Sequence, residues 1–323
     1  MTLITIVIPV FFNEESLFTL MERLNNVSLE MTTVDFEYVF VDDGSGDNSF
    51  QVLTQIAKND KRVKVIKLSR NFGSFEACFA GLTYSTGDCT LIMAADLQDP
   101  PELINDLYQK WKNGSEIVYA IRKNREESRI KVMFSNLYYR IFKLIALNNM
   151  PIQGFDFVLL GRKAVDVLVK SHEKNSTLMG QILWIGFKTD HLYYTKKERP
   201  FGKSKWTIRK KGKYFFDSII AFSNFPIRAI SFTGFTVAFL GFLFGLFIIC
   251  QKIFFGIDIQ GFATLVVLLI FTSGMQMIML GVIGEYLWRN LEETKKRPIY
   301  IVEDVIGIQE DAIDDISARL DTG

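Results

Sequence analysis

The sequence predicts an α/β domain with a mainly parallel sheet, followed by interfacial helices and a two-helix transmembrane hairpin. Three observations lead to this fold class. Strand-like and helix-like segments alternate from residue 4 to residue 95. Polar residues follow directly after three of the strand-like segments. Two long uncharged segments, 230–250 and 262–284, come after a basic stretch. Alternation of the first kind gives a parallel sheet with helices on both faces.

Each expected strand is a short apolar run that ends in polar or turn-forming residues, and a helix-like segment follows it. The strands are expected at residues 4–11, 36–41, 63–68 and 91–95. The helices between them are expected at residues 14–27, 47–59 and 75–83. Asn13 is a suitable N-cap for the first helix. Pro100 and Pro101 end the fourth strand and precede a polar helix start at Glu102.

Three of the strand ends carry side chains suited to ligand binding. They are the segments Pro9 to Glu14, Asp42 to Ser45 and Asp96 to Asp99. The carboxyl ends of parallel strands lie on one edge of the sheet, where open α/β sheets bind ligands, so we expect the three segments to converge there. A carboxylate such as that of Asp42 can accept from a base N–H or a ribose hydroxyl. For Asp43, capping of the following turn is an equal alternative.

A divalent cation is expected at the third strand end. No G-x-G-x-x-G or G-x-x-x-x-G-K-[ST] pattern follows a strand, so bound phosphates would lack a glycine-rich cradle. The oxygens of Asp96 and Gln98 suit Mg²⁺ or Mn²⁺ held jointly with substrate phosphates. The alternative is a strand that simply ends in an acidic turn. His172 and His191 are isolated in the sequence, which argues against a histidine metal cluster.

Composition narrows the partners and the compartment. The 323 residues carry a formal net charge of +1, which gives no indication of a nucleic-acid partner. The three cysteines show no paired spacing, as is usual in a reducing compartment. The apolar run from Leu3 to Phe12 has no basic region before it and no small-residue cleavage site after it. We therefore expect it to be a strand, and we expect the N-terminal domain to remain in the cytoplasm.

The second half of the chain indicates a multi-pass protein of the plasma (inner) membrane. Nine lysines and arginines and a single glutamate lie between Lys196 and Lys213, which favours a membrane surface or phosphate groups. We expect a cytoplasmic domain at 1–206, interfacial amphipathic helices at 207–229, two transmembrane helices at 230–284 and a cytoplasmic tail at 285–323. The basic flanks place both termini in the cytoplasm. The acidic tail beyond Ile301 is compatible with an amphipathic helix. Buried core helices are the alternative for the two spans.

Five motifs together resemble one family. IVIPVFFNEES, FVDDGSGDNS, RNFGSFEA, TGDCTLIMAADLQDPPEL and FGKSKW occur in this order. They are similar to motifs of the inverting family-two glycosyltransferases, which have a GT-A nucleotide-sugar (Rossmann-like) fold. With the two spans and the ending GEYLWRNLEETKKRPIY, residues 3–305 resemble the polyprenyl-phosphate glycosyltransferases, which include bactoprenol glucosyltransferases and relatives of dolichol-phosphate mannose synthase. The resemblance implies a nucleotide-sugar donor, a polyprenyl-phosphate acceptor, a divalent metal and a bilayer as partners. Self-association into a homo-oligomer is compatible with it.

The resemblance also implies roles for individual residues. The donor-binding residues are expected to be Pro9, Glu14, Asp42, Asp43 and Asp96. The metal ligands are expected to be Asp96 and Gln98, and the catalytic residues Asp96 and Asp156. The acceptor phosphate is expected to meet Lys131, Arg140, Arg162, Lys203 and Lys205.

Two departures from the family pattern concern this site. The family has D-A-D-L-Q-D where this chain has Ala94 at the first aspartate, so one carboxylate is missing. The family has G-D-F-R-L-L-D-R where this chain has Val158 at the first arginine, so Lys131, Arg140 or Lys203 is expected to supply that charge.

The implied reaction is transfer of a hexose from a nucleotide-sugar, a UDP-hexose, to undecaprenyl phosphate at the cytoplasmic face, with inversion and release of the nucleoside diphosphate. A phosphate monoester has a second pKa near ~6 and is already a nucleophile at neutral pH, so no general base is required. One alternative is a synthase that uses GDP-mannose. A processive polysaccharide synthase is disfavoured because the chain has no Q-x-x-R-W and only two spans. A third alternative, a catalytically impaired scaffold or flippase partner, rests on Ala94 and Val158.

Overall fold

The computed structural model describes residues 1–124, 137, 139–151, 153–171, 173–196, 200, 212, 217–255 and 261–308. The chain divides into two compact units. The first consists of Met1–Ile219 together with Pro298–Gly323, and the second is Ile220–Arg297. Each unit is described by itself.

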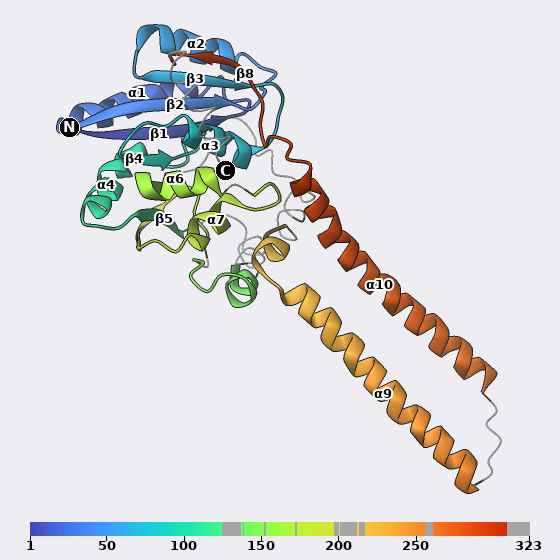
Figure 1. Cartoon of the computed structure of the whole chain (residues 1–323). Helices are drawn as coiled ribbons and strands as arrows, with labels where there is room; N and C mark the ends of the chain where they lie inside the picture. Colours follow the sequence, from blue (N-terminus) through green and yellow to red (C-terminus); the bar gives the residue numbers. More distant parts are fainter. Residues whose placement is uncertain are drawn as a thin grey trace. The chain divides into compact units, whose positions relative to one another are not determined.

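The first unit is built on a sheet that has eight strands in the described part of the chain (Figure 1). Their order is β7-β5-β6-β4-β1-β2-β3-β8. The strands are β1 (Thr2–Val10), β2 (Val34–Asp42), β3 (Val63–Leu68), β4 (Cys89–Ile92), β5 (Ile117–Asn124), β6 (Val158–Gly161), β7 (Thr189–Thr195) and β8 (Val302–Ile306). Only β6 and β8 run against their neighbours. The predicted α/β fold with a mainly parallel sheet is therefore confirmed.

The predicted alternation of strands and helices is also confirmed over the first half of the chain. The helices of the first unit are α1 (Leu17–Glu30), α2 (Ser49–Asn59), α3 (Ser74–Thr83), η1 (Pro101–Leu103, a 3₁₀ turn), α4 (Ile104–Lys112), α6 (Arg162–Lys170) and α7 (Leu178–Trp184). The predicted N-cap of the first helix is wrong. Ser16 occupies that position. Asn13 stabilises the turn before the helix instead. Its side-chain oxygen accepts from the backbone N–H of Phe11 at 3.0 Å.

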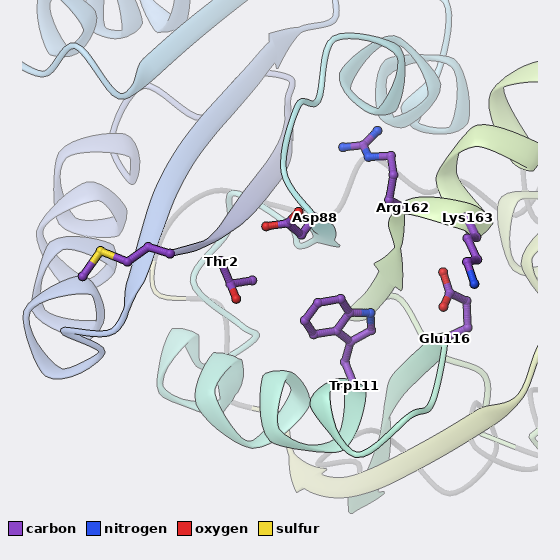
Figure 2. A pocket seen from close by; sticks show the side chains of 7 residues that line it. Thr2, Asp88, Trp111, Glu116, Arg162 and Lys163 are labelled. Carbon is purple, nitrogen blue, oxygen red and sulfur yellow. The ribbon is translucent and has the colours of Figure 1, made fainter.

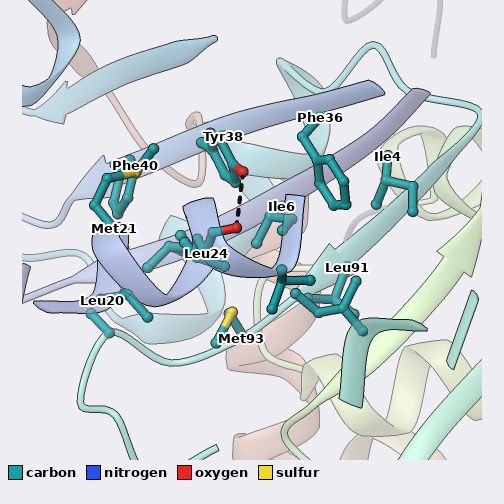
Figure 3. Close-up of a cluster of buried hydrophobic side chains, with 14 of the residues drawn as sticks. Ile4, Ile6, Leu20, Met21, Leu24, Phe36, Tyr38, Phe40, Leu91 and Met93 are labelled. Carbon is teal, nitrogen blue, oxygen red and sulfur yellow. Dashed lines mark hydrogen bonds between the residues drawn. The ribbon is translucent and has the colours of Figure 1, made fainter. Parts of the chain in front are cut away.

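The hydrophobic core lies on both faces of the sheet. Side chains of β1 alternate between the faces, as the period of two requires. Ile4 and Ile6 face α1, where they lie among Leu24 and neighbouring apolar side chains (Figure 3). On the opposite face Val7 lies so close to Gly81 of α3 that a Cβ there would be 2.2 Å from a Val7 methyl group. Burial on both faces is typical of parallel strands and explains their nearly continuous apolar sequence.

β8 corrects the expectation of an amphipathic helix after Ile301. Val302–Ile306 pairs antiparallel with β3, and Ser69 donates its backbone N–H to the carbonyl of Ile301 at 2.9 Å. Lys67 of β3 pairs with Glu303 at 2.9 Å. The segment is rich in β-branched residues, which favour a strand, and the edge of β3 offers unpaired backbone groups. Residues 309–323 lie outside the described part.

The second unit contains α9 (Phe225–Phe255) and α10 (Phe262–Thr294), which lie side by side (Figure 1). Their candidate membrane spans, Phe225–Gln251 and Val267–Thr294, have mean hydropathies of 2.3 and 2.0. Helices of this length exceed the ~30 Å of a bilayer's hydrocarbon core. Neither span is buried within the described residues, which disfavours the core-helix alternative. Of the expected interfacial segment, residues 217–222 are helical and α9 begins at Phe225.

Candidate active site

The structure brings the three predicted strand ends together at the carboxyl edge of the sheet. β1 pairs in parallel with both β2 and β4, so all three strands end on the same side. The hydroxyl of Ser16, after β1, donates to the carbonyl of Ala95, after β4, at 2.8 Å. The backbone N–H of Phe12 donates to the hydroxyl of Ser45, after β2, at 3.1 Å. These bonds fix the relative positions of the segments on which the candidate site is built.

Asp42 presents an unused buried acceptor at this edge. Its side chain is fully buried, and its Oδ1 accepts from the backbone N–H of Ser45 at 3.2 Å. Its Oδ2 is buried and has no hydrogen-bond partner among the described residues. Burial raises the pKa of this carboxyl. Buried polar atoms are nearly always hydrogen-bonded, so Oδ2 suits an N–H or hydroxyl donated by a ligand.

Two further predicted donor-binding residues, Pro9 and Glu14, lie on β1 and just after it. Pro9 is half-buried in β1 and is in register with Val41. Glu14 is half-buried, and its carboxylate accepts from the backbone N–H of Asn48 at 2.8 Å. This bond ties the segment after β1 to the start of α2. The carboxylate of Glu14 thus already supports the local structure.

Asp43 points to a different partner, the loop between β3 and α3. Its carboxylate accepts from the side-chain amide of Asn71 at 2.9 Å and from the backbone N–H groups of Phe72 and Gly73 at 2.7 and 3.0 Å. Burial raises the pKa of this carboxyl to about 6, against the lowering effect of these bonds. Gly44 has a φ of 67°, and a Cβ there would be 2.5 Å from the carbonyl carbon of Arg70. Only glycine allows so close an approach.

Because Asp43 holds this loop, we expect Asp43→Ala to destabilise the protein. Two backbone N–H groups and one amide would lose their acceptor in a largely buried place, at a cost of about 2–4 kcal/mol in the free energy of unfolding. Chemical denaturation of the purified protein measures this change. Asp35→Ala, at an exposed position of β2, is the matched control and should be nearly neutral. An equal loss in both variants would contradict the assignment.

Asp96 and Gln98 form a tight turn just after β4. The side chain of Asp96 is buried, and its Oδ1 accepts from the backbone N–H of Gln98 at 3.1 Å. Leu97 between them has a φ of 62°, a left-handed conformation that non-glycine residues seldom adopt and that is typical of functional sites. Ala94 adds no oxygen ligand.

This turn fits a cation that takes most of its ligands from elsewhere. The described residues contain no cluster of three or more His, Cys, Asp or Glu side chains placed to hold a metal. Asp96 offers a cation one carboxylate, and Gln98 offers it one amide oxygen. Mg²⁺ is commonly bound in this way, through one or two carboxylates with substrate phosphates and water completing its shell. The donor set is therefore compatible with the predicted Mg²⁺ or Mn²⁺.

A cluster of ionic side chains at the same edge includes residues that the sequence analysis missed. We call it the Arg122 cluster, and it consists of Asp99, Arg122, Asp156, Tyr194 and Lys196. Arg122 lies near the end of β5 and forms an ion pair with Asp156, which precedes β6. The Nζ of Lys196, just after β7, is 3.9 Å from Asp99 Oδ1 and 4.0 Å from Asp156 Oδ2. The two cations are thus shared between a buried and an exposed carboxylate.

None of the predicted acceptor residues that the structure describes joins this cluster. Arg162 begins α6 at the opposite, amino-terminal edge of β4, where its Nε donates to the carbonyl of Gly87 at 2.9 Å. It lines a hollow of about 520 Å³ with Asp88, Trp111 and Glu116 (Figure 2). Arg140 is exposed in the helical segment 139–145. Lys131, Lys203 and Lys205 lie outside the described residues.

Arg122 places a cation beside Asp156, two residues before Val158. Val158 itself is buried in β6, where it pairs with Ile92 of β4. The cation beside Asp156 comes instead from the neighbouring strand β5. The signal for it was present in the sequence. The apolar run from Ile117 to Ile121 ends in Arg122, just as the earlier strands end in functional side chains.

Comparison with known proteins adds independent findings. The family model described as glycosyl transferase family 2 matches residues 5–169. The uncharacterized glycosyltransferase YkcC of Bacillus subtilis (strain 168) is 38% identical over 306 residues, 94% of this chain and 94% of the relative. The bactoprenol glucosyl transferase of Shigella phage SfX is 34% identical over 301 residues, 93% of this chain and 98% of the relative. The crystal structure of glucosyl-3-phosphoglycerate synthase from Mycobacterium tuberculosis, in complex with Mn²⁺, uridine diphosphate and phosphoglyceric acid, is 12% identical, with a TM-score of 0.49 and coverage of 68% of this chain and 76% of that one.

Proposed function

Because the chain belongs to glycosyl transferase family 2, it is a glycosyltransferase, and we propose that it transfers a hexose from a UDP-sugar to a polyprenyl phosphate such as undecaprenyl phosphate. The reaction takes place at the cytoplasmic face of the membrane and inverts the anomeric centre. The observation that carries the proposal is the similarity to a bactoprenol glucosyl transferase over 93% of the chain, apolar helices included. The product is a lipid-linked sugar for use in a cell-surface glycan.

The donor side of the site is formed by the segments after β1, β2 and β4. The unpartnered Oδ2 of Asp42 accepts a hydrogen bond from the nucleoside. Asp96 and Gln98 would hold the Mg²⁺ or Mn²⁺, together with the diphosphate. A cation bound there supplies charge neutralisation for the departing nucleoside diphosphate. These two residues orient the diphosphate, while the buried strand ends exclude water from it.

The acceptor side is formed by the Arg122 cluster. A prenyl phosphate is close to dianionic at neutral pH, so its oxygen attacks the anomeric carbon directly and no residue has to remove a proton. The protein's contribution is then positioning and charge stabilisation. Arg122 and Lys196 attract and orient the phosphate. Asp156 keeps these two cations at the edge of the site, because it lies within ion-pair distance of both.

The proposal is tested by assaying the full chain in detergent with undecaprenyl phosphate and a panel of radiolabelled donors. UDP-glucose, UDP-galactose, UDP-N-acetylglucosamine and GDP-mannose are compared by counting label in the organic extract. We expect a UDP-hexose to give labelled lipid, and we expect EDTA to prevent it. Label from GDP-mannose alone would favour the mannose synthase alternative. The absence of labelled lipid with every donor would favour a scaffold or flippase partner.

The basic segment before the membrane helices is proposed to gather the acceptor from the membrane surface. Each lysine near the headgroup plane contributes about 1 kcal/mol to attraction of an anionic group. Lys203→Ala combined with Lys205→Ala should therefore raise the KM for lipid phosphate about tenfold or more and leave nucleotide affinity nearly unchanged. Steady-state kinetics with a short, water-soluble prenyl phosphate separates this role from membrane adhesion. A normal KM for that acceptor with weakened donor binding would assign the segment to the donor diphosphate.

Both termini are proposed to face the cytoplasm. Five basic residues precede the first span, namely Arg209, Lys210, Lys211, Lys213 and Arg228, and four follow the second, namely Arg289, Lys295, Lys296 and Arg297. Lys252 is the only lysine or arginine in the link between the spans. Because lysines and arginines near span ends favour the cytoplasmic side, reporter fusions at Met1 and Gly323 should both give a cytoplasmic signal. An external signal from either fusion would contradict this topology.

A further inference from the structure

The buried base of the Arg122 cluster is a hydrogen-bonded pair, Asp99 and Tyr194. The side chain of Asp99 is fully buried, in the turn after β4. Its Oδ1 accepts from the hydroxyl of Tyr194, on β7, at 2.5 Å. Its Oδ2 is buried and has no hydrogen-bond partner in the part of the chain that the structure describes. An ionised carboxylate in such a place needs nearby positive charge to offset its desolvation.

Arg122 and Lys196 supply that charge from the side of the cluster nearer the solvent. Burial lowers the pKa of the Arg122 guanidinium, but Tyr194, Asp99 and Tyr139 together raise it above its ordinary value. Lys196 Nζ lies 3.9 Å from Asp99. On the other side both cations reach Asp156, whose side chain is 51% exposed. Asp99 and Tyr194 therefore lie beneath the cations, while the exposed carboxylate lies at the surface.

We propose that Asp99 and Tyr194 are positioning residues, which hold the guanidinium of Arg122 in the orientation that the acceptor phosphate requires. This inference rests on the proposed function. Neither residue touches the acceptor, and both act through Arg122. The observations that carry it are the buried Tyr194–Asp99 hydrogen bond and the position of Arg122 between this pair and the exposed Asp156.

The physical reason is preorganisation. An arginine side chain carries about 2 kcal/mol of rotamer entropy, and its planar fork binds phosphate best through two parallel hydrogen bonds. With the Tyr194–Asp99 pair intact, the guanidinium is already oriented when the phosphate binds. Without this pair, the Arg122 side chain loses rotamer entropy each time the phosphate binds, and binding is weaker.

A double-mutant cycle tests this coupling. Tyr194→Phe removes one hydroxyl and keeps the ring. Arg122→Gln removes the guanidinium. The readouts are the Kd for a water-soluble short-chain prenyl phosphate, the KM for the same acceptor, the KM for the donor and the thermal unfolding midpoint. Tyr193→Phe is the matched control, because Tyr193 is the adjacent residue of β7 and its side chain is 60% exposed.

We expect Tyr194→Phe to weaken acceptor binding about tenfold, since a hydrogen bond to a charged group is lost. The donor KM should stay close to wild type, the unfolding midpoint should fall because the buried Asp99 carboxylate loses its hydrogen-bond donor, and Tyr193→Phe should change nothing. In the Arg122→Gln background, Tyr194→Phe should have no further effect on acceptor binding. Independent, additive effects of the two substitutions would overturn the inference, because contacting residues that act together are not additive. An equal loss of donor and acceptor binding would overturn it as well.

The binding readout separates this inference from the proposed function. A wild-type protein that binds prenyl phosphate with the expected coupling, but transfers no sugar from any donor, supports the inference and contradicts the function. A protein that transfers sugar but shows additive effects supports the function and contradicts the inference. A wild-type protein that does not bind prenyl phosphate contradicts both.

Discussion

Asp96→Asn is expected to reduce kcat about 10²–10³-fold while the protein remains folded. Asp96 supplies the one carboxylate of the proposed metal-ligand pair Asp96 and Gln98, because Ala94 replaces the carboxylate found at that position in the family pattern. Asparagine keeps the size of the side chain and an oxygen that can accept from the Gln98 N–H. The loss therefore reports on the charge at this position and not on packing. Steady-state turnover with saturating donor and acceptor measures it.

A second measurement connects this effect to the cation. Titration of activity with Mn²⁺ should show a weaker apparent affinity in Asp96→Asn than in the wild type. Asp106→Asn provides the matched control, since Asp106 is exposed on α4 and lies in a first helical turn. It should leave both turnover and Mn²⁺ dependence unchanged. Wild-type turnover in Asp96→Asn would overturn the metal assignment.

Arg122→Gln is expected to lower kcat/KM for the acceptor about 100-fold, the second-largest effect. The substitution removes the guanidinium that pairs with Asp156 and lies above Asp99. A charge-assisted, bidentate contact with a phosphate dianion is lost, and such contacts are among the strongest hydrogen bonds in proteins. The KM for the donor should change by less than about twofold, because Arg122 lies on β5, outside the segments that hold the nucleotide.

The control for Arg122 is an arginine that pairs with a carboxylate at the surface. Arg23 forms such a pair with Glu102 at 2.7 Å, and exposed pairs of this kind contribute about 0–1 kcal/mol. Arg23→Gln should therefore have little effect on either substrate. If Arg122→Gln instead weakens donor binding as much as acceptor binding, Arg122 serves the donor diphosphate, and the division of the site into two sides is wrong.

The sequence predicts the first half of the sheet well for a simple reason. Strands β1 to β4 alternate with helices, and right-handed crossovers then place their carboxyl ends on one edge. Asp42 and Asp96 could be located by this rule alone. The distinct roles of Asp42 and Asp43 could not, because the two side chains turn to different sides and the partner of Asp43 is a loop 28–30 residues further along the chain.

Arg122 could be identified as a strand-end residue, but the partners in its cluster could not be predicted, because the strands that carry them are not paired in sequence order. β6 inserts antiparallel between β4 and β5, and β7 then lies beyond β5. Asp99 and Tyr194, separated by 95 residues in the chain, meet only through this arrangement. The pairing of β8 with β3 could not be predicted either, because it depends on which edge of the sheet is left open. Local patterns of hydrophobicity carry no information on either point.

The position of β8 in the chain also sets the order in which the protein is completed during synthesis. β3 and its partner β8 are separated in the chain by both apolar helices. At about 5–20 residues per second, a ribosome needs on the order of 10–50 s to pass from one to the other. During this time the edge of β3 is open to pairing with another chain, as unpaired strand edges are. The final strand of the sheet thus becomes available only after both hydrophobic helices have left the ribosome, and completion of the sheet is tied to their delivery to the bilayer.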